Sequence, residues 1–228
     1  MGLKGKRILI TAGPTWVPID NVRVLSNIAT GETGVLLARQ AAAQGARVTL
    51  LIGPSGECNL NKSIQVIRLR FFNELKNILK RELKNNTYDI IIHSAAVSDF
   101  YPVRKKFPKE KRLSNGFKPT YKLGGKLSSN RAHSLKLVPL EKLVVMIRHL
   151  AGKTKLVMFK LETAVTDRAL IQRAKKAAKK VNADLVVANR LNPYRAFIIE
   201  KGGKQILVKN KQQLARRLVE ILSNSFNS

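Results

Sequence analysis

The sequence predicts an α/β fold of the Rossmann-like kind, in which helices cover both faces of a doubly wound, mostly parallel sheet. Short apolar runs alternate with longer amphipathic stretches along the chain, and that alternation is typical of βαβ units. The first unit is complete before residue 54, with an apolar strand, a glycine-bearing loop, a helix and a second strand in succession. Strands linked in this way are parallel, so the order of the elements predicts the sheet.

The individual elements follow from the spacing of apolar residues and from the glycines and prolines that bound each run. Strands are predicted at residues 6–11, 47–53, 63–69, 88–96, 155–161 and 183–189, helices at residues 31–45, 71–83, 139–150, 166–181 and 211–223, and a hairpin at residues 196–209 that turns at Gly202 and Gly203. The hairpin adds a mixed, antiparallel edge to the sheet.

Residues 100–131 interrupt this alternation. They are rich in Lys, Arg, Pro, Gly and Ser and poor in apolar residues, a composition that favours a long flexible flap loop over a linker between domains. A chain of 228 residues is long enough for one large core but short for two. We therefore predict a single domain over residues 1–228.

The chain carries 43 Lys and Arg against 14 Asp and Glu, a formal charge of +29. Such an excess attracts polyanions: RNA, DNA, an anionic surface or a phosphorylated metabolite. Many of the lysines have ordinary amphipathic spacing, as in the KKAAKK string at residues 175–180, and this spacing is also typical of a solvated helix face. Charge alone therefore leaves the partner open.

Cysteine, histidine and apolar content limit the chemistry and the location. Cys58 is the only cysteine, which excludes an intrachain disulfide and a cysteine-based metal cluster, and no paired histidine activates it. His93, His133 and His149 lack ligand spacing, so we predict no zinc site. No apolar run reaches the length of a membrane span, and the N-terminal apolar stretch is short for a signal peptide. We expect a cytoplasmic protein without a membrane partner.

Ligands of open α/β sheets bind outside the carboxyl ends of the strands. Four stretches should lie there: residues 11–34, 94–103, 159–163 and 188–193. The first lacks the G-x-G-x-x-G turn of a dinucleotide fingerprint. It delivers small residues and hydrogen-bond donors to a helix N-terminus, where phosphate is favoured, although the same types also cap helices and form turns: Arg23, Ser26, Asn27, Thr30, Gly31 and Gly34.

The second stretch ends a buried strand in Ala95 and Ala96 and continues to Ser98 and Asp99. The two alanines would let a flat group approach the backbone. Asp99 could bind a ribose hydroxyl, a base or a hydrated magnesium ion, or could simply organise a turn.

Together the strand-end strings resemble one family. The chain contains ITAGPT, then PID, VR and SN with T-G following, then AAVSD, F-x-x-ET and D-x-V-x-AN. In this order and spacing they resemble phosphopantothenoylcysteine synthetase over residues 6 to about 220. Each string is common by itself, whereas the ordered set at strand ends is specific.

The resemblance implies a ligase reaction. The carboxylate of 4'-phosphopantothenate would attack the α-phosphate of CTP or ATP and release pyrophosphate, and the amine of L-cysteine would then displace the nucleoside monophosphate from the acyl-nucleotide. Mg²⁺ and lysines would neutralise the developing charge. The resemblance also implies a homodimer and no flavin. The flavin-dependent decarboxylase domain of many relatives is not expected within this chain, so a separate decarboxylase is a candidate partner.

The resemblance also assigns roles to individual residues. Asn27 would hold the acyl-nucleotide and aid its conversion, and Lys126 would be the lysine of the flap over the triphosphate. Arg23 would lie on the phosphate side. The remaining implied contacts are Gly13, Ala96, Asp99, Phe159, Lys176 and Lys180 for the nucleotide, and Thr30, Gly31 and Asn189 for substrate or phosphate. For Lys176 and Lys180 a solvated helix face is the alternative.

Three departures from the family pattern matter. KLSS stands at residues 126–129 where a K-I-K-K string is usual, so two positive charges are missing. Glu141 and Lys142 replace a proline–aspartate pair, which affects one nucleotide contact. The string FKLET is closer to the ATP-using eukaryotic form than to the bacterial FAAET, which leaves the nucleobase open.

The sequence supports two other functions less well. A short-chain dehydrogenase needs a tyrosine and a lysine four residues apart on a regular helix, as Tyr101 and Lys105 are spaced, but Pro102 argues for an extended chain. A nucleic-acid-binding module would interleave aromatic and basic residues, whereas aromatic residues make up 6% and fall mostly in apolar runs.

Overall fold

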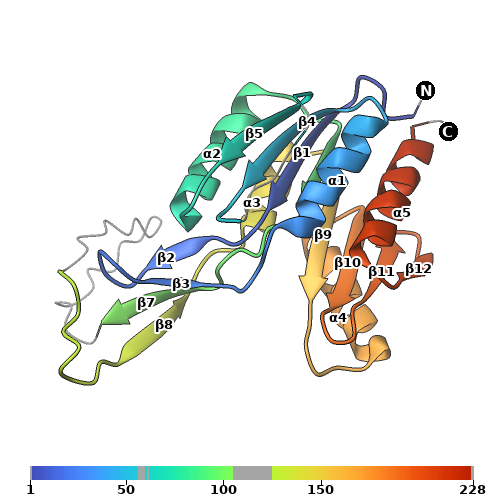
Figure 1. The fold of residues 1–228 in the computed structure, drawn as a ribbon. Helices are drawn as coiled ribbons and strands as arrows, with labels where there is room; N and C mark the ends of the chain where they lie inside the picture. Colours follow the sequence, from blue (N-terminus) through green and yellow to red (C-terminus); the bar gives the residue numbers. More distant parts are fainter. Residues whose placement is uncertain (1, 56–59, 61, 105–124, 227–228) are drawn as a thin grey trace.

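The computed structural model describes residues 2–55, 60, 62–104 and 125–226. Its centre is an eight-stranded sheet with the order β12-β11-β10-β9-β6-β1-β4-β5 (Figure 1). The strands of this sheet are β1 (Arg7–Ala12), β4 (Arg47–Ile52), β5 (Ile64–Arg68), β6 (Ile90–His93), β9 (Lys155–Leu161), β10 (Leu185–Arg190), β11 (Arg195–Glu200) and β12 (Gln205–Val208). Pairing from β5 to β10 is parallel, and β11 and β12 pair antiparallel. The predicted mostly parallel sheet with an antiparallel edge is confirmed.

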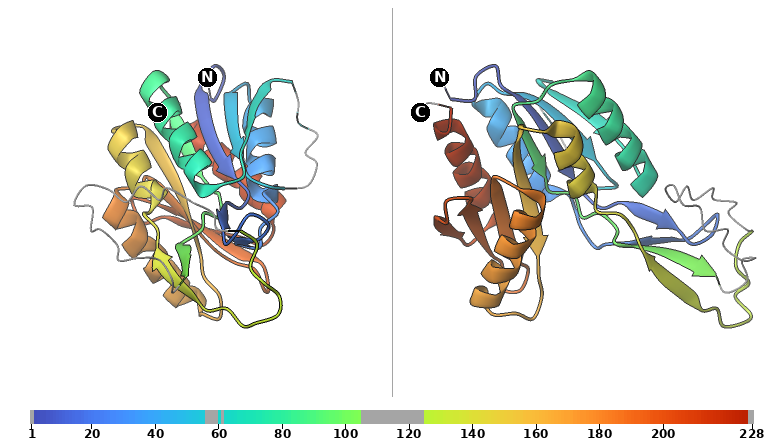
Figure 2. Two further views of the ribbon diagram at one scale, coloured as in Figure 1. Left: turned by 90° about the vertical axis from the view of Figure 1, so that its left-hand side faces the viewer. Right: turned by 180° about the vertical axis from the view of Figure 1, so that it is seen from behind.

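Helices cover both faces of the sheet, as a doubly wound fold requires (Figure 2). Helices α1 (Glu32–Ala43) and α5 (Lys211–Asn224) pack on one face, and α2 (Phe72–Asn85), α3 (Leu143–Ala151) and α4 (Asp167–Val181) pack on the other. Side chains along a strand alternate between the faces: Ile8 and Ile10 join the first core, and Leu9 joins the second. Strand β1 is therefore buried from both sides, which explains its unbroken apolar run.

Two antiparallel ribbons extend from the carboxyl edge of the sheet and were not predicted (Figure 1). One pairs β2 (Trp16–Pro18) with β3 (Val24–Ser26), inside the glycine-bearing loop that the sequence predicts between the first strand and the first helix. The other pairs β7 (Phe100–Arg104), at the start of the expected flap region 100–131, with β8 (Leu135–Pro139), which follows the end of that region. Within the region, residues 105–124 lie outside the described residues.

Strand β8 also corrects the helix predicted at residues 139–150. Pro139 ends β8, and the helix begins only at Leu143. Leu143 and Ile147, one helical turn apart, are the residues that bury against the second core. Tyr101 lies in β7, so the helix needed for a dehydrogenase pair with Lys105 does not form there. Among the described residues no helix is both long and apolar enough to cross a membrane.

Candidate active site

Glycines after β1 and at the start of α1 let these two backbone segments meet at the carboxyl edge of the sheet. Gly13 and Gly31 both have positive φ, and a Cβ on Gly31 would lie 3.3 Å from the Gly13 Cα. A Cβ on Gly34 would lie only 2.4 Å from the Ala12 Cβ. The first turn of α1 therefore packs directly on the end of β1, and its N-terminal dipole is directed to this corner.

Asn27 joins the loop after β3 to the loop after β6. Its Nδ2 donates hydrogen bonds to the carbonyl oxygens of Ala96 at 3.2 Å and Val97 at 3.0 Å. The amide of Ala96 in turn donates to the carbonyl of Gly13 at 2.9 Å. Asn27 is nevertheless exposed. The structure thus brings Gly13, Gly31, Asn27 and Ala96, which the sequence predicted as site residues, to one exposed corner.

Buried hydroxyls hold the same two loops together, and the sequence did not single them out as a pair. The Ser98 hydroxyl donates to the Thr15 carbonyl at 2.7 Å, and the Ser98 amide donates to the Thr15 Oγ1 at 2.9 Å. Both residues are buried. Because 83 residues separate them, no local pattern could have revealed the contact.

The ends of β9 and β10 form a further part of the carboxyl edge of the sheet. Phe159 is paired in register with Val187 and is half-buried, and the carbonyl of Asn189 accepts a hydrogen bond from the Glu162 amide at 3.1 Å. The hydrogen bond from Lys160, with one from Arg173, holds the pKa of the Glu162 carboxyl below its usual range. Phe159 and Asn189 therefore lie near the carboxyl ends of two neighbouring strands.

The Asp99 carboxylate is already engaged: it forms an ion pair with Lys142, one of the residues that depart from the family pattern. Magnesium sites that hold nucleotides usually use one or two carboxylates together with substrate phosphates. Within the described ranges no three His, Cys, Asp or Glu side chains are grouped to hold a metal ion. These residues fit a magnesium ion carried mainly by the triphosphate, with at most Asp99 assisting.

The tip of the β2–β3 ribbon carries Arg23 and contacts the segment that contains Lys126. The Arg23 guanidinium donates to the carbonyl of Leu127 at 3.1 Å and pairs with Asp20 at 3.3 Å. Asp20 also accepts a hydrogen bond from the Leu127 amide at 3.0 Å. Arg23 therefore contacts the residue that follows Lys126 in the sequence, although 104 residues separate Arg23 from Leu127. Asp20, which belongs to the PID string, received no role from the sequence.

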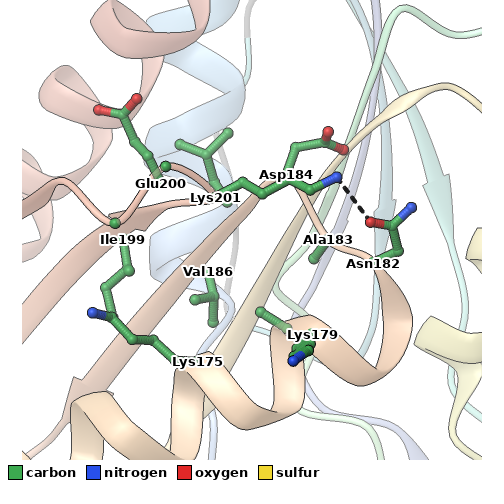
Figure 3. A pocket seen from close by; sticks show the side chains of 13 residues that line it. Lys175, Lys179, Asn182, Ala183, Asp184, Val186, Ile199, Glu200 and Lys201 are labelled. Carbon is green, nitrogen blue, oxygen red and sulfur yellow. Dashed lines mark hydrogen bonds between the residues drawn. The ribbon is translucent and has the colours of Figure 1, made fainter.

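Lys176 and Lys180 are not brought to this edge. Helix α4 runs antiparallel to the strands, so its later turns lie towards the amino ends, and both lysines are exposed there. Their nucleotide contact stays a prediction, and their position favours a solvated face. A cleft of about 380 Å³ also lies at this opposite edge, lined by Lys175, Lys179, Asn182, Asp184 and Lys201 among others (Figure 3).

His93, the last residue of β6, stabilises the loop after this strand through the Thr11 hydroxyl. Its Nδ1 lies 2.8 Å from the Thr11 Oγ1, and that oxygen accepts a hydrogen bond from the Ala95 amide at 3.2 Å. Burial lowers the pKa of His93 to about 4. The imidazole is therefore neutral at physiological pH, in keeping with a structural role beneath the site.

This pKa predicts a pH dependence of stability. The unfolded chain takes up a proton on His93 near the ordinary value of 6.5, whereas the folded chain does so only near 4. The free energy of unfolding should therefore fall as the pH falls from about 6.5 towards 4. Denaturation of His93→Gln across this range should show a shallower fall, while the exposed control His149→Gln should match the wild type. Equal slopes in all three proteins would contradict the assignment.

The fold defines a class: an α/β protein with a doubly wound sheet, whose predicted site residues gather mainly at the carboxyl edge, where such folds bind ligands. A family model described as the DNA/pantothenate metabolism flavoprotein C-terminal domain matches residues 3–225. The chain belongs to this family.

Relatives agree with this placement. A Coenzyme A biosynthesis bifunctional protein CoaBC from Thermococcus kodakarensis is 32% identical over 222 residues, which cover 95% of this chain and 50% of that protein. The chain spans about half the length of the curated relatives it matches.

Solved structures agree as well. The DNA/pantothenate metabolism flavoprotein from Streptococcus pneumoniae superposes with a TM-score of 0.81 at 25% identity, covering 97% of this chain and 100% of that one. A Cab2 variant in complex with phosphopantothenate-cysteine shares the fold, with a TM-score of 0.69 at 20% identity, over 98% of this chain and 89% of that one.

Proposed function

We propose that this chain is a phosphopantothenate–cysteine ligase of coenzyme A biosynthesis. The observation that carries the proposal is the convergence of the family strings at one edge: Asn27 bridges to Ala96, and Ala96 to Gly13. The names of the relatives and the ligand of the Cab2 complex support the same substrates. The excess of positive charge fits phosphorylated substrates.

In the proposed reaction the protein works by positioning. The phosphopantothenate carboxylate attacks the α-phosphate of the nucleoside triphosphate, and pyrophosphate leaves. The cysteine amine then attacks the acyl carbon, the nucleoside monophosphate leaves, and the amine loses a proton. Gly13, Ala96 and Phe159 would border the nucleotide, and Thr30 and Gly31 at the start of α1 would face phosphate.

The nucleoside triphosphate is CTP or ATP in this proposal, and magnesium accompanies it. The triphosphate brings most of the ligands for the ion, because Asp99 is paired with Lys142. Lys126 and Arg23 would supply positive charge on the phosphate side. We place the reaction in the cytoplasm, where a chain with the single cysteine Cys58 needs no disulfide.

We also propose a homodimer, and a decarboxylase partner that is either a domain or another protein. Both ribbons expose large apolar side chains, at Val22, Val24, Phe100 and Leu137. Apolar residues grouped on extensions of this kind are typical of a subunit interface. Because the relatives that are twice as long are named bifunctional, a decarboxylase would supply the second activity.

The test is pyrophosphate release from purified protein with phosphopantothenate and magnesium, run separately with CTP and with ATP. Release should require phosphopantothenate, and sustained turnover should require cysteine, because the second step frees the site for another cycle. Omitting magnesium should abolish release, since charge on the triphosphate then goes unneutralised. Absence of release with both nucleotides would overturn the proposal, as would turnover of a nicotinamide cofactor with a ketone instead.

A further inference from the structure

Asp20 is a buried carboxylate at the tip of the β2–β3 ribbon, where little else is buried. The residue is 2% exposed. Its Oδ1 accepts hydrogen bonds from the amides of Val22 at 2.8 Å and Arg23 at 2.7 Å, which shapes the turn. Its Oδ2 makes no contact within the turn backbone but accepts from the amide of Leu127 at 3.0 Å, 107 residues away. The two oxygens therefore have separate partners, one local and one distant.

Arg23 completes this contact from the other side. Its guanidinium donates to the Leu127 carbonyl at 3.1 Å and lies 3.3 Å from the Asp20 Oδ2. Leu127 is thus held at both its N–H and its C=O, and we call Asp20, Arg23 and Leu127 the ribbon clamp. The held N–H belongs to the peptide unit that links Lys126 to Leu127. Holding this peptide fixes the backbone of Lys126 against the ribbon.

The charge on Asp20 strengthens the clamp. The hydrogen bonds from Leu127, Val22 and Arg23 lower the pKa of Asp20 to about 2, so the carboxylate is ionised at neutral pH. Hydrogen bonds to an ionised acceptor are about twice as strong as neutral ones. Lys126 itself is exposed. A long exposed lysine has many conformers, and a fixed backbone reduces the volume that its ammonium group explores.

We propose that Asp20 is a positioning residue, which holds Lys126 through the ribbon clamp at the place from which it contacts the triphosphate. This role rests on the proposed ligase function. It also gives the chain a means to orient its flap lysine although the two further lysines usual at residues 128 and 129 are serines. Asp20 does not touch substrate in this proposal; it acts through Lys126.

The isosteric change Asp20→Asn separates the clamp from the turn. An asparagine oxygen can still accept from the two turn amides, but its NH₂ group then faces the donors of Leu127 and Arg23. The KM for the triphosphate should rise about tenfold, the scale for losing one hydrogen bond to a charged group. The amide of Leu127 should exchange its hydrogen faster. Glu220→Gln, which neutralises the ion-paired carboxylate of Glu220 on α5, should change neither the KM for the triphosphate nor the exchange rate at Leu127.

A double-mutant cycle with Lys126→Ala decides whether Asp20 acts through that lysine. If it does, Asp20→Asn should raise the KM no further once Lys126 is alanine. Additive effects would overturn the proposal, as would an unchanged KM in Asp20→Asn despite faster exchange at Leu127. Should Asp20→Asn not fold, Leu127→Pro removes the same hydrogen bond from the donor side and enters the cycle in its place.

Failure of the clamp and failure of the function are distinguishable. An active wild type with an unaffected Asp20→Asn variant overturns the positioning role alone. A wild type that releases no pyrophosphate with either nucleotide overturns the ligase function, and the positioning role falls with it, whatever the exchange at Leu127 shows.

Discussion

Asn27→Asp is expected to slow product formation by roughly 10²-fold or more, the scale for displacing a reacting group by about 1 Å. The side-chain amide now donates to the carbonyls of Ala96 and Val97. An aspartate has no N–H to donate, so its carboxylate would face two carbonyl oxygens and turn away from them. The change also adds negative charge beside an anionic intermediate.

The step that fails can be identified. If Asn27 acts after activation of the carboxylate, the variant should release pyrophosphate about once per site and then retain the acyl-nucleotide. Mass spectrometry after an acid quench would detect that intermediate. If Asn27 acts in activation itself, pyrophosphate release should fall together with product formation, and no intermediate should accumulate.

Asn210→Asp is the matched control. Asn210 is the N-cap of α5, and its Oδ1 accepts a hydrogen bond from the Gln213 amide at 2.7 Å. Aspartate serves equally well as an N-cap, so this variant makes the same amide-to-carboxylate change away from the site. It should keep full turnover. Equal activity of Asn27→Asp and the wild type would remove Asn27 from the site and weaken the proposed function.

The sheet was predictable because its signals are local. Each central strand is an apolar run, β1 and β4 run directly into Gly13 and Gly53, and β1 is buried on both faces by α1 and α2. The ribbons were not predictable because their strands carry no clear local signal. Strands β2 and β3 have three residues each, too few to show alternation, and β8 exposes most of its side chains.

The candidate site was partly predictable, because topology alone places strand ends together. Gly13 follows β1, Ala96 follows β6 and Asn189 lies near the end of β10, and a parallel sheet brings those strand ends to one edge. The contacts that fix the loops depend on partners distant in sequence, as between Asp20 and Leu127. An aspartate two residues before a turn amide indicates only a local turn. The sequence therefore could not predict that Asp20 also accepts a hydrogen bond from Leu127.

Gly53→Ala is expected to lower the free energy of unfolding by about 3 kcal/mol, at the upper end for overpacking of a close-packed site. A Cβ on Gly53 would lie 1.8 Å from the carbonyl oxygen of Pro14, and a backbone atom cannot rotate away as a side chain can. Pro14 would have to move, and Pro14 forms a parallel bridge with Ala96. The change should therefore also weaken nucleotide binding, because the corner that contains Gly13 and Ala96 shifts.

Gly202→Ala tests whether this loss comes from the close approach or from glycine itself. No atom lies within 4 Å of the Cβ that Gly202 would gain, and its φ is not in the left-handed region. Removing glycine there only restricts the unfolded chain, so its stability should be unchanged or slightly raised. Denaturant unfolding of both variants gives the comparison. If Gly53→Ala unfolds at the same denaturant concentration as Gly202→Ala, then β4 does not end against Pro14. The close packing at the corner that contains Gly13 and Ala96 would then be incorrect.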